Sequence, residues 1–183
     1  MKRYYFVIAL VVSFSLLLGC GSKPMQTTSA KNQPDWYKKV PTGNDYLYAA
    51  FSAVSQDMQL AVDKAAAGAR EEIGRQVEAK ILSMQKRFDE EVGLGKDAKL
   101  LQMYTDATKI VVNTTLNGTH VKDKSLLKDD EYWRAYVLVE YPIGEMNANF
   151  VRSVKQNTEL YTRMRAAEAF QELEKSVETP TGK

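Results

Sequence analysis

The chain has 183 residues, of which 26% are charged and 44% hydrophobic, and its formal net charge is +2. A nearly neutral chain without a block of like charges does not favour a nucleic-acid partner. About 140 residues remain after the leader and linker predicted below, which is enough for one domain.

The N-terminus is typical of an export signal. Lys2 and Arg3 give it a positive start, and an apolar run follows from Phe6 to Leu18. An apolar stretch of this length behind basic residues is the pattern of a secretory signal peptide. We therefore predict a signal peptide over residues 1–19, whose removal would lower the net charge to about zero.

Cys20 is the only cysteine in the chain and follows Leu17, Leu18 and Gly19 directly. These four residues resemble the bacterial lipobox, in which the cysteine receives a diacylglycerol and becomes the first mature residue. Two or three acyl chains on one residue hold a protein stably at a bilayer. An acylated Cys20 would leave no thiol for a disulfide or a catalytic nucleophile.

Residues 4–22 also lack charge and could nearly span a bilayer as a retained anchor. Gly19 and Gly21 weaken the end of such a helix, so cleavage before Cys20 is the favoured prediction. Gly21 stands where an aspartate would signal retention at the inner membrane under the sorting rule of enteric bacteria. The sequence therefore predicts outer-membrane attachment, on a side that it does not determine.

Residues 20–44 are predicted to form a flexible tether, because they are polar and contain three prolines before position 42. Trp36 and Tyr37 are the exception, since an aromatic pair can dock the end of the tether onto the domain. That domain is expected over residues 45–178, followed by a disordered tail at 179–183.

Residues 45–54 alternate in the period of a strand, with Leu47 and Phe51 on one side and Tyr46 and Tyr48 on the other. A long amphipathic helix is predicted next, beginning after Ser55 as its N-cap and reaching Val92.

Gly93 and Gly95 should end this helix, while Gly68 and Gly74 within it could permit close packing or a bend. Asp97 can cap a second helix that ends near Gly118.

Two further strands are predicted over residues 119–128 and 132–141, joined as a hairpin by the polar turn 129–131. Residues 145–177 then read as one final helix. The order strand, helix, helix, strand, strand, helix predicts an α+β fold, in which a small antiparallel sheet has long helices packed on one face as an open sandwich.

Several segments give the chain a resemblance to the LPP-twenty family of bacterial outer-membrane lipoproteins. They are the lipobox, residues 34–36, the alanine-rich run 61–73, the turn 116–119 and residues 132–138. The resemblance covers nearly the whole mature chain and includes no catalytic motif. It implies an open sandwich of sheet and helices, attachment to the outer membrane, and a role in envelope or motility structures.

The sequence offers no convincing catalytic, cofactor or metal motif. His120 is the sole histidine and lacks neighbours at ligand spacing, and the acidic turn 129–131 lacks the surrounding ligands of a calcium loop. No nucleophile elbow or phosphate-binding glycine loop is present. We therefore predict a protein that is not an enzyme and has no cofactor.

One constellation of side chains forms a candidate interaction surface. If helices cover the Leu47 face of the sheet, the opposite face presents aromatic and basic residues: Tyr46, Tyr48, His120, Lys122, Lys124, Tyr132, Arg134 and Tyr136. Three interpretations stay open, namely plain cross-strand tyrosine pairs, a surface for self-association or envelope proteins, and a binding site for an envelope glycan or other ligand.

The favoured function is a structural or assembly role in the cell envelope, and the alternative is a periplasmic binding module for peptidoglycan or a small ligand. Apolar residues off the main helix stripes, such as Leu60, Leu82 and Leu160, favour oligomers.

Overall fold

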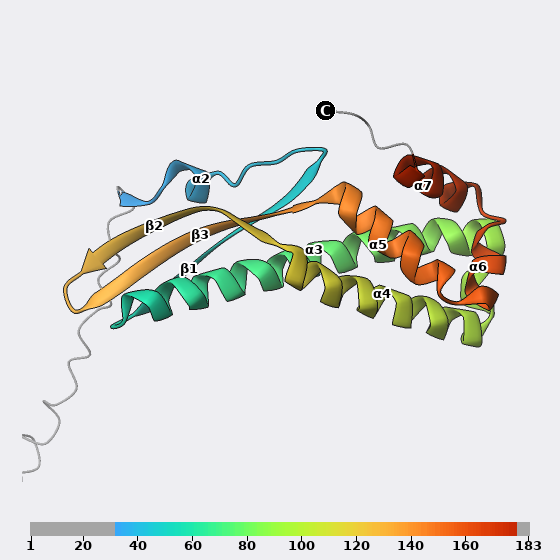
Figure 1. Cartoon of the computed structure of the whole chain (residues 1–183), viewed down its shortest axis with the longest axis horizontal. Helices are drawn as coiled ribbons and strands as arrows, with labels where there is room; N and C mark the ends of the chain where they lie inside the picture. Colours follow the sequence, from blue (N-terminus) through green and yellow to red (C-terminus); the bar gives the residue numbers. More distant parts are fainter. Residues whose placement is uncertain (1–31, 179–183) are drawn as a thin grey trace, which may run out of the picture. The chain divides into compact units, whose positions relative to one another are not determined.

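The computed structural model of the protein describes residues 32–178 (Figure 1). The predicted signal peptide, Cys20, the first part of the tether and the tail at 179–183 lie outside the described residues.

The sheet consists of three antiparallel strands: β1 (Tyr46–Ser55), β2 (His120–Asp129) and β3 (Tyr132–Pro142). Their order is β1-β3-β2, so β3 lies in the centre. All three strands were predicted to within about one residue at each end. The predicted hairpin is confirmed as β2–β3, with Asp130 in its turn at a φ of 53°, a left-handed conformation that aspartate tolerates better than most residues.

The long helix α3 runs from Met58 to Val92. Its N-cap is Asp57 and not Ser55 as predicted, because the Asp57 carboxylate accepts a hydrogen bond from the backbone N–H of Leu60 at 2.7 Å. Gly93 ends the helix at a φ of 66°, a backbone conformation that favours glycine.

A short 3-10 turn, η2 (Leu94–Lys96), leads from α3 to α4 (Ala98–Gly118). Asp97 caps α4 as predicted, and its carboxylate accepts from the N–H groups of Lys99 and Leu100.

The prediction of one final helix over residues 145–177 is wrong. The structure contains α5 (Ile143–Lys155), α6 (Thr158–Met164) and α7 (Glu168–Glu178). Asn157 lies between α5 and α6 and is the N-cap of α6, because its side chain accepts a hydrogen bond from the backbone N–H of Leu160. The apolar spacing continued across these breaks, so periodicity alone did not reveal them.

A short helix, α2 (Asp35–Lys38), precedes β1. It lies within the segment that the sequence assigned to the tether, and it packs against β1 and β3. The expected docking near the end of the tether is confirmed for Tyr37, by the contacts described below.

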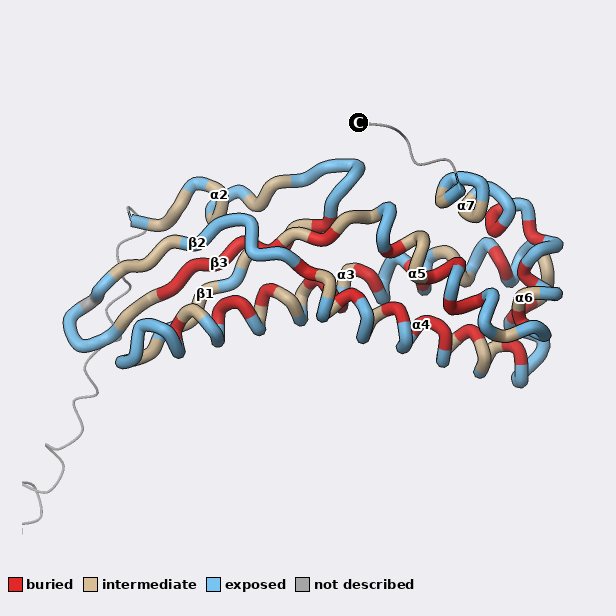
Figure 2. Tube along the Cα trace, in the orientation of Figure 1, coloured by how far each residue is buried: buried red, intermediate tan, exposed pale blue. Residues whose placement is uncertain are grey.

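Helix α3 covers β1 and β3 on one face of the sheet, and farther along the chain it packs against α4 and α7 (Figures 1 and 2). Near its start α3 buries small side chains at Ala61, Ala65, Ala66 and Ala69, and farther along it buries larger ones at Ile73, Val77, Ile81 and Phe88. The α+β fold predicted from the sequence, with helices packed on a small antiparallel sheet, is confirmed.

Both glycines within α3 lie at close approaches, as the sequence suggested. A Cβ atom at Gly68 would come within 2.5 Å of the Phe51 ring on β1, and one at Gly74 within 3.2 Å of the Leu116 side chain on α4. The missing side chain at Gly68 therefore gives Phe51 room to lie over the helix.

Phe88 is the centre of an aromatic cluster that joins the helices. Its ring centroid lies 6.1 Å from that of Tyr104 on α4, 6.3 Å from Phe150 on α5 and 6.4 Å from Phe170 on α7. All four side chains are fully buried. The Tyr104 hydroxyl donates to the carbonyl oxygen of Ile81 at 2.7 Å, and burial raises the pKa of Tyr104.

We predict that Phe88→Ala lowers the free energy of unfolding by about 3–5 kcal/mol, because it removes a buried ring and leaves a cavity shared by four helices. Urea denaturation followed by circular dichroism measures this change. Leu82→Ala is the matched control, since Leu82 lies on the same helix but is 48% exposed; its expected effect is within about 0.5 kcal/mol. Equal losses in both variants would contradict the role of the cluster.

Candidate functional site

The register of the sheet decides which residues share the face opposite α3. Tyr48 lies opposite Glu140 of β3, and Glu140 lies opposite His120 of β2, so these three residues form one row across the sheet. Residues directly opposite one another in antiparallel strands lie on the same face. The predicted placement of Tyr48 and His120 on a common face is therefore confirmed.

Tyr46, Tyr48, Lys122 and Glu140 lie close together at one end of this face, and we call them the Tyr48 cluster. The Tyr46 and Tyr48 ring centroids are 6.1 Å apart, and the Lys122 ammonium lies 5.0 Å from the Tyr48 centroid. The same ammonium donates to the Glu140 carboxylate at 2.6 Å, and this hydrogen bond raises the pKa of Lys122.

The Tyr48 cluster can therefore present aromatic surface beside a fixed charge pair. Glu140 was absent from the predicted surface, although its place in the alternation of β3 put it on this face. A search of the sequence for oppositely charged residues on the same face of the two hairpin strands could have identified Glu140 as a partner of Lys122.

Lys124 does not belong to this face, which corrects the prediction. A bulge between Val121 and Asp123 shifts the register, so that Lys124 lies opposite Val137, on the side of the sheet that α3 covers. An extra residue in one strand moves every later side chain to the other face. Lys124 lines a hollow of about 470 Å³ there, together with Lys122 and Val62 of α3.

The centre of the predicted surface is covered by α2. The Tyr37 ring lies edge-on to the Tyr136 ring at a centroid distance of 4.7 Å, and the Tyr37 and Ser52 hydroxyls are hydrogen-bonded at 3.1 Å. Tyr136 is only 2% exposed as a result, so its predicted place on the candidate interaction surface is wrong. Arg134, in the next alternate position along the same face of β3, is half-buried.

Tyr132 is 47% exposed but lies at the opposite end of β3 from the Tyr48 cluster. Tyr132 pairs with Asp129 beside the hairpin turn, whereas Tyr46 pairs with Pro142 at the far end of the strand. The eight predicted residues therefore do not form one surface. The structure brings together Tyr46, Tyr48, Lys122 and His120, and it separates them from Tyr132, Lys124 and the covered Tyr136.

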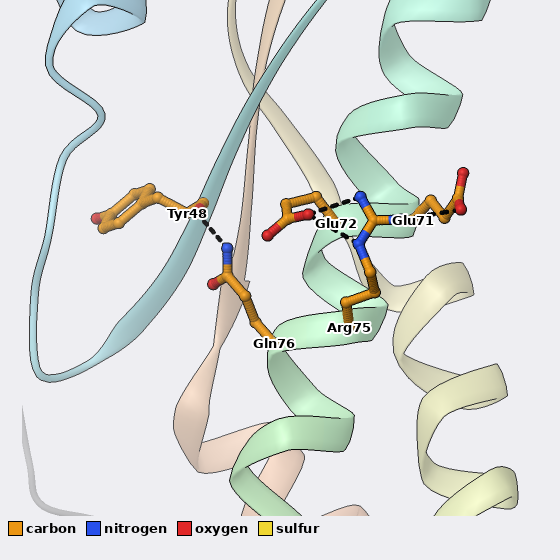
Figure 3. A network of polar contacts seen from close by, with 5 residues as sticks. All are labelled: Tyr48, Glu71, Glu72, Arg75 and Gln76. Carbon is orange, nitrogen blue, oxygen red and sulfur yellow. Dashed lines mark hydrogen bonds and ion pairs between the residues drawn. The ribbon is translucent and has the colours of Figure 1, made fainter.

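The backbone of β1 receives a side-chain hydrogen bond beside this cluster. The Gln76 amide on α3 donates to the carbonyl oxygen of Tyr48 at 3.1 Å (Figure 3). The neighbouring Arg75 donates to Glu71 and Glu72 on the solvent-exposed flank of α3. The sequence analysis did not single out Gln76. It is a polar residue beside the apolar stripe of α3, and nothing in the sequence indicates that it bonds to the backbone of β1.

Further hollows lie among the helices. One of about 640 Å³ is lined by residues of α4 and α6, including Leu100 and Thr162. Another of about 230 Å³ lies between α3 and α7.

Within residues 32–178, no three His, Cys, Asp or Glu side chains come together as a metal site would require. No helix in this part of the chain is long and apolar enough to cross a membrane.

Comparison of the chain with known protein families, with curated proteins and with solved structures gave no match.

We predict that Tyr37→Ala releases α2 from the sheet and lowers the free energy of unfolding by about 1–3 kcal/mol, because it removes the ring contact with Tyr136 and part of the apolar cover. Trypsin should then cut after Lys38 or Lys39 faster than in the wild type, as gel electrophoresis and mass spectrometry would show. Tyr132→Ala is the control, since Tyr132 is exposed and belongs to the same sheet. An unchanged cleavage rate in Tyr37→Ala would contradict the docking of α2.

Proposed function

We propose that this protein is a lipid-anchored lipoprotein of the bacterial outer membrane that has a structural or assembly role in the cell envelope. The observation that carries the proposal is the position of Cys20, the only cysteine, directly after Leu17-Leu18-Gly19 and behind a charged and then apolar N-terminus. The resemblance to the LPP-twenty family supports the same location. The proposed role is binding of other proteins or of further copies of this chain.

The described domain supports a binding role through its exposed aromatic and apolar side chains. Tyr46 is 39% exposed and Tyr132 is 47% exposed, at opposite ends of one sheet face. Aromatic residues are enriched where proteins meet, because they bury large areas at a small cost in side-chain entropy. The charge pair of Lys122 and Glu140 beside Tyr48 adds polar contacts that fix the orientation of a partner.

The alternative function is binding of peptidoglycan or a small ligand at the Tyr48 cluster. The stacked arrangement of Lys122 over Tyr48 favours it, because aromatic rings beside charged groups also bind sugars and anions. Tyr46, Tyr48 and Glu140 line none of the hollows described above, and Lys122 alone of the cluster reaches one, beneath β2. A small ligand usually binds in a concave pocket, and this difference makes protein assembly the better supported function.

Purified sacculi distinguish the two functions. Under the assembly proposal, the wild type and Tyr48→Ser should remain equally in the supernatant when mixed with sacculi and centrifuged. Sedimentation of the wild type that falls at least several-fold in Tyr48→Ser would favour the binding module. Tyr132→Ser, at the far end of the same face, is the matched control for this experiment.

The anchoring proposal predicts that Cys20 carries acyl chains and that residues 1–19 are absent from the mature protein. Cells that express the chain with labelled palmitate should incorporate label into the wild type and none into Cys20→Ser, since no other cysteine can form the thioether. Mass spectrometry of the N-terminal peptide checks the cleavage. A free thiol at Cys20, or a mature chain that keeps residues 1–19, would contradict the proposal.

A further inference from the structure

The outer edge of β1 is open within the described part of the chain. β1 is the last strand in the order β1-β3-β2, so only one of its two edges is paired within the sheet. In an antiparallel ladder, the N–H and C=O groups of one residue point to the same side, and successive residues alternate. The direction of a few carbonyl groups therefore shows which residues face outward.

Two hydrogen bonds give that direction. The carbonyl oxygen of Asp45 accepts from the N–H of Ile143, which follows β3, whereas the carbonyl oxygen of Tyr48 accepts from the Gln76 side chain. The odd-numbered residues of β1 therefore point toward β3, and the even-numbered ones point away from it. Ala50, Ser52 and Val54 present their backbone groups at the open edge, beyond the one carbonyl that Gln76 already binds.

The two edge strands differ in the features that prevent strand addition. β2 carries Lys122, Lys124 and Lys128 and contains the bulge after Val121. Lysines and bulges are the means by which natural sheets keep their edges from pairing with another chain. β1 has neither, because its ten residues include no charged side chain and its register with β3 runs without a shift.

Apolar side chains accompany this open edge on both faces of the sheet. Phe51, on the face covered by α3, is 42% exposed, and Val54, on the opposite face, is 39% exposed. Partner strands bury such side chains against their own, and cross-strand apolar pairs stabilise a sheet. The edge therefore offers both backbone hydrogen bonds and apolar contact.

We propose that β1 pairs in antiparallel orientation with β1 of a second copy of this chain, which joins the two sheets into one. The inference rests on the proposed assembly role and names its partner. When two copies of β1 pair about a twofold axis, each residue of one strand lies opposite a residue of the other. Because β1 has no charged side chain, this pairing brings no like charges together, and this favours a second copy as the partner. Pairing of β1 with β2 of another copy would instead meet the lysines and the bulge.

Photo-crosslinking in cells tests the proposal with the full chain. A benzophenone-bearing phenylalanine analogue replaces Phe51 in one variant and Val121 in the other, since these residues have similar exposure, at 42% and 44%, but lie on opposite edges of the sheet. Irradiation should give an adduct of twice the monomer mass from position 51 and at least tenfold less from position 121. Mass spectrometry should identify the adduct as two copies of the chain, joined within β1.

Other outcomes overturn the proposal. An adduct to another protein, an adduct within a single chain, no adduct from position 51, or equal yields from both positions would each do so. The adduct should also fall at least tenfold when Ala50→Pro is added, because the N–H of Ala50 points away from β3 and its loss leaves the internal ladder intact. Should circular dichroism show that Ala50→Pro is misfolded, Val54→Lys places a charge at the same edge and should give the same loss.

The test separates this inference from the anchoring proposal. Labelled palmitate reports on Cys20 alone, and crosslinking from position 51 reports on β1 alone. Acylated Cys20 with no adduct would overturn the strand pairing and leave the anchoring proposal in place. A β1 adduct with a free thiol at Cys20 would overturn the anchoring proposal and leave the strand pairing in place.

Discussion

The gradient of side-chain size along α3 is the constraint on which the rest of the structure depends. Its first half buries alanines and holds Gly68 under Phe51, so a sheet can approach the helix closely. Its second half contains Phe88, whose buried ring contacts aromatic rings from three other helices. One continuous helix thus supports a sheet at one end and a helical bundle at the other. The open edge of β1 lies where the small residues set the packing, since Phe51 of β1 packs over Gly68.

The elements with strong local signals could be predicted from the sequence. The strict alternation of β3 fixed its bounds and faces, and Gly93 and Asp97 marked where one helix ends and the next begins, because a left-handed residue and a capping carboxylate are local requirements. The split of the last helix at Asn157 was missed, since the apolar spacing continues through the break and hides it. The choice of Asp57 over Ser55 as N-cap depends on where β1 stops, which is settled by pairing with β3 and not by the local sequence.

The candidate surface was less predictable, because each error came from a contact between distant segments. Lys124 changed faces through a bulge whose cause lies in the pairing of two strands. Tyr136 was covered by Tyr37, which approaches from a segment far away in sequence. What remained exposed is a smaller cluster around Tyr48 and an uncharged strand edge, two neighbouring features of β1. Both features support the proposed assembly role.

The position of β3 at the centre of the sheet has a consequence for how the chain acquires its fold. Ser55 pairs with Trp133 and Tyr46 with Pro142, so both long helices and β2 are synthesised before β1 meets its neighbour. Contacts so distant along the chain form slowly, because a large loop must close first. During this delay an uncharged and largely apolar strand has both edges free, and unpaired strand edges favour aggregation of nascent chains. Because β2 is followed at once by β3, β1 is the strand that waits longest for its partner.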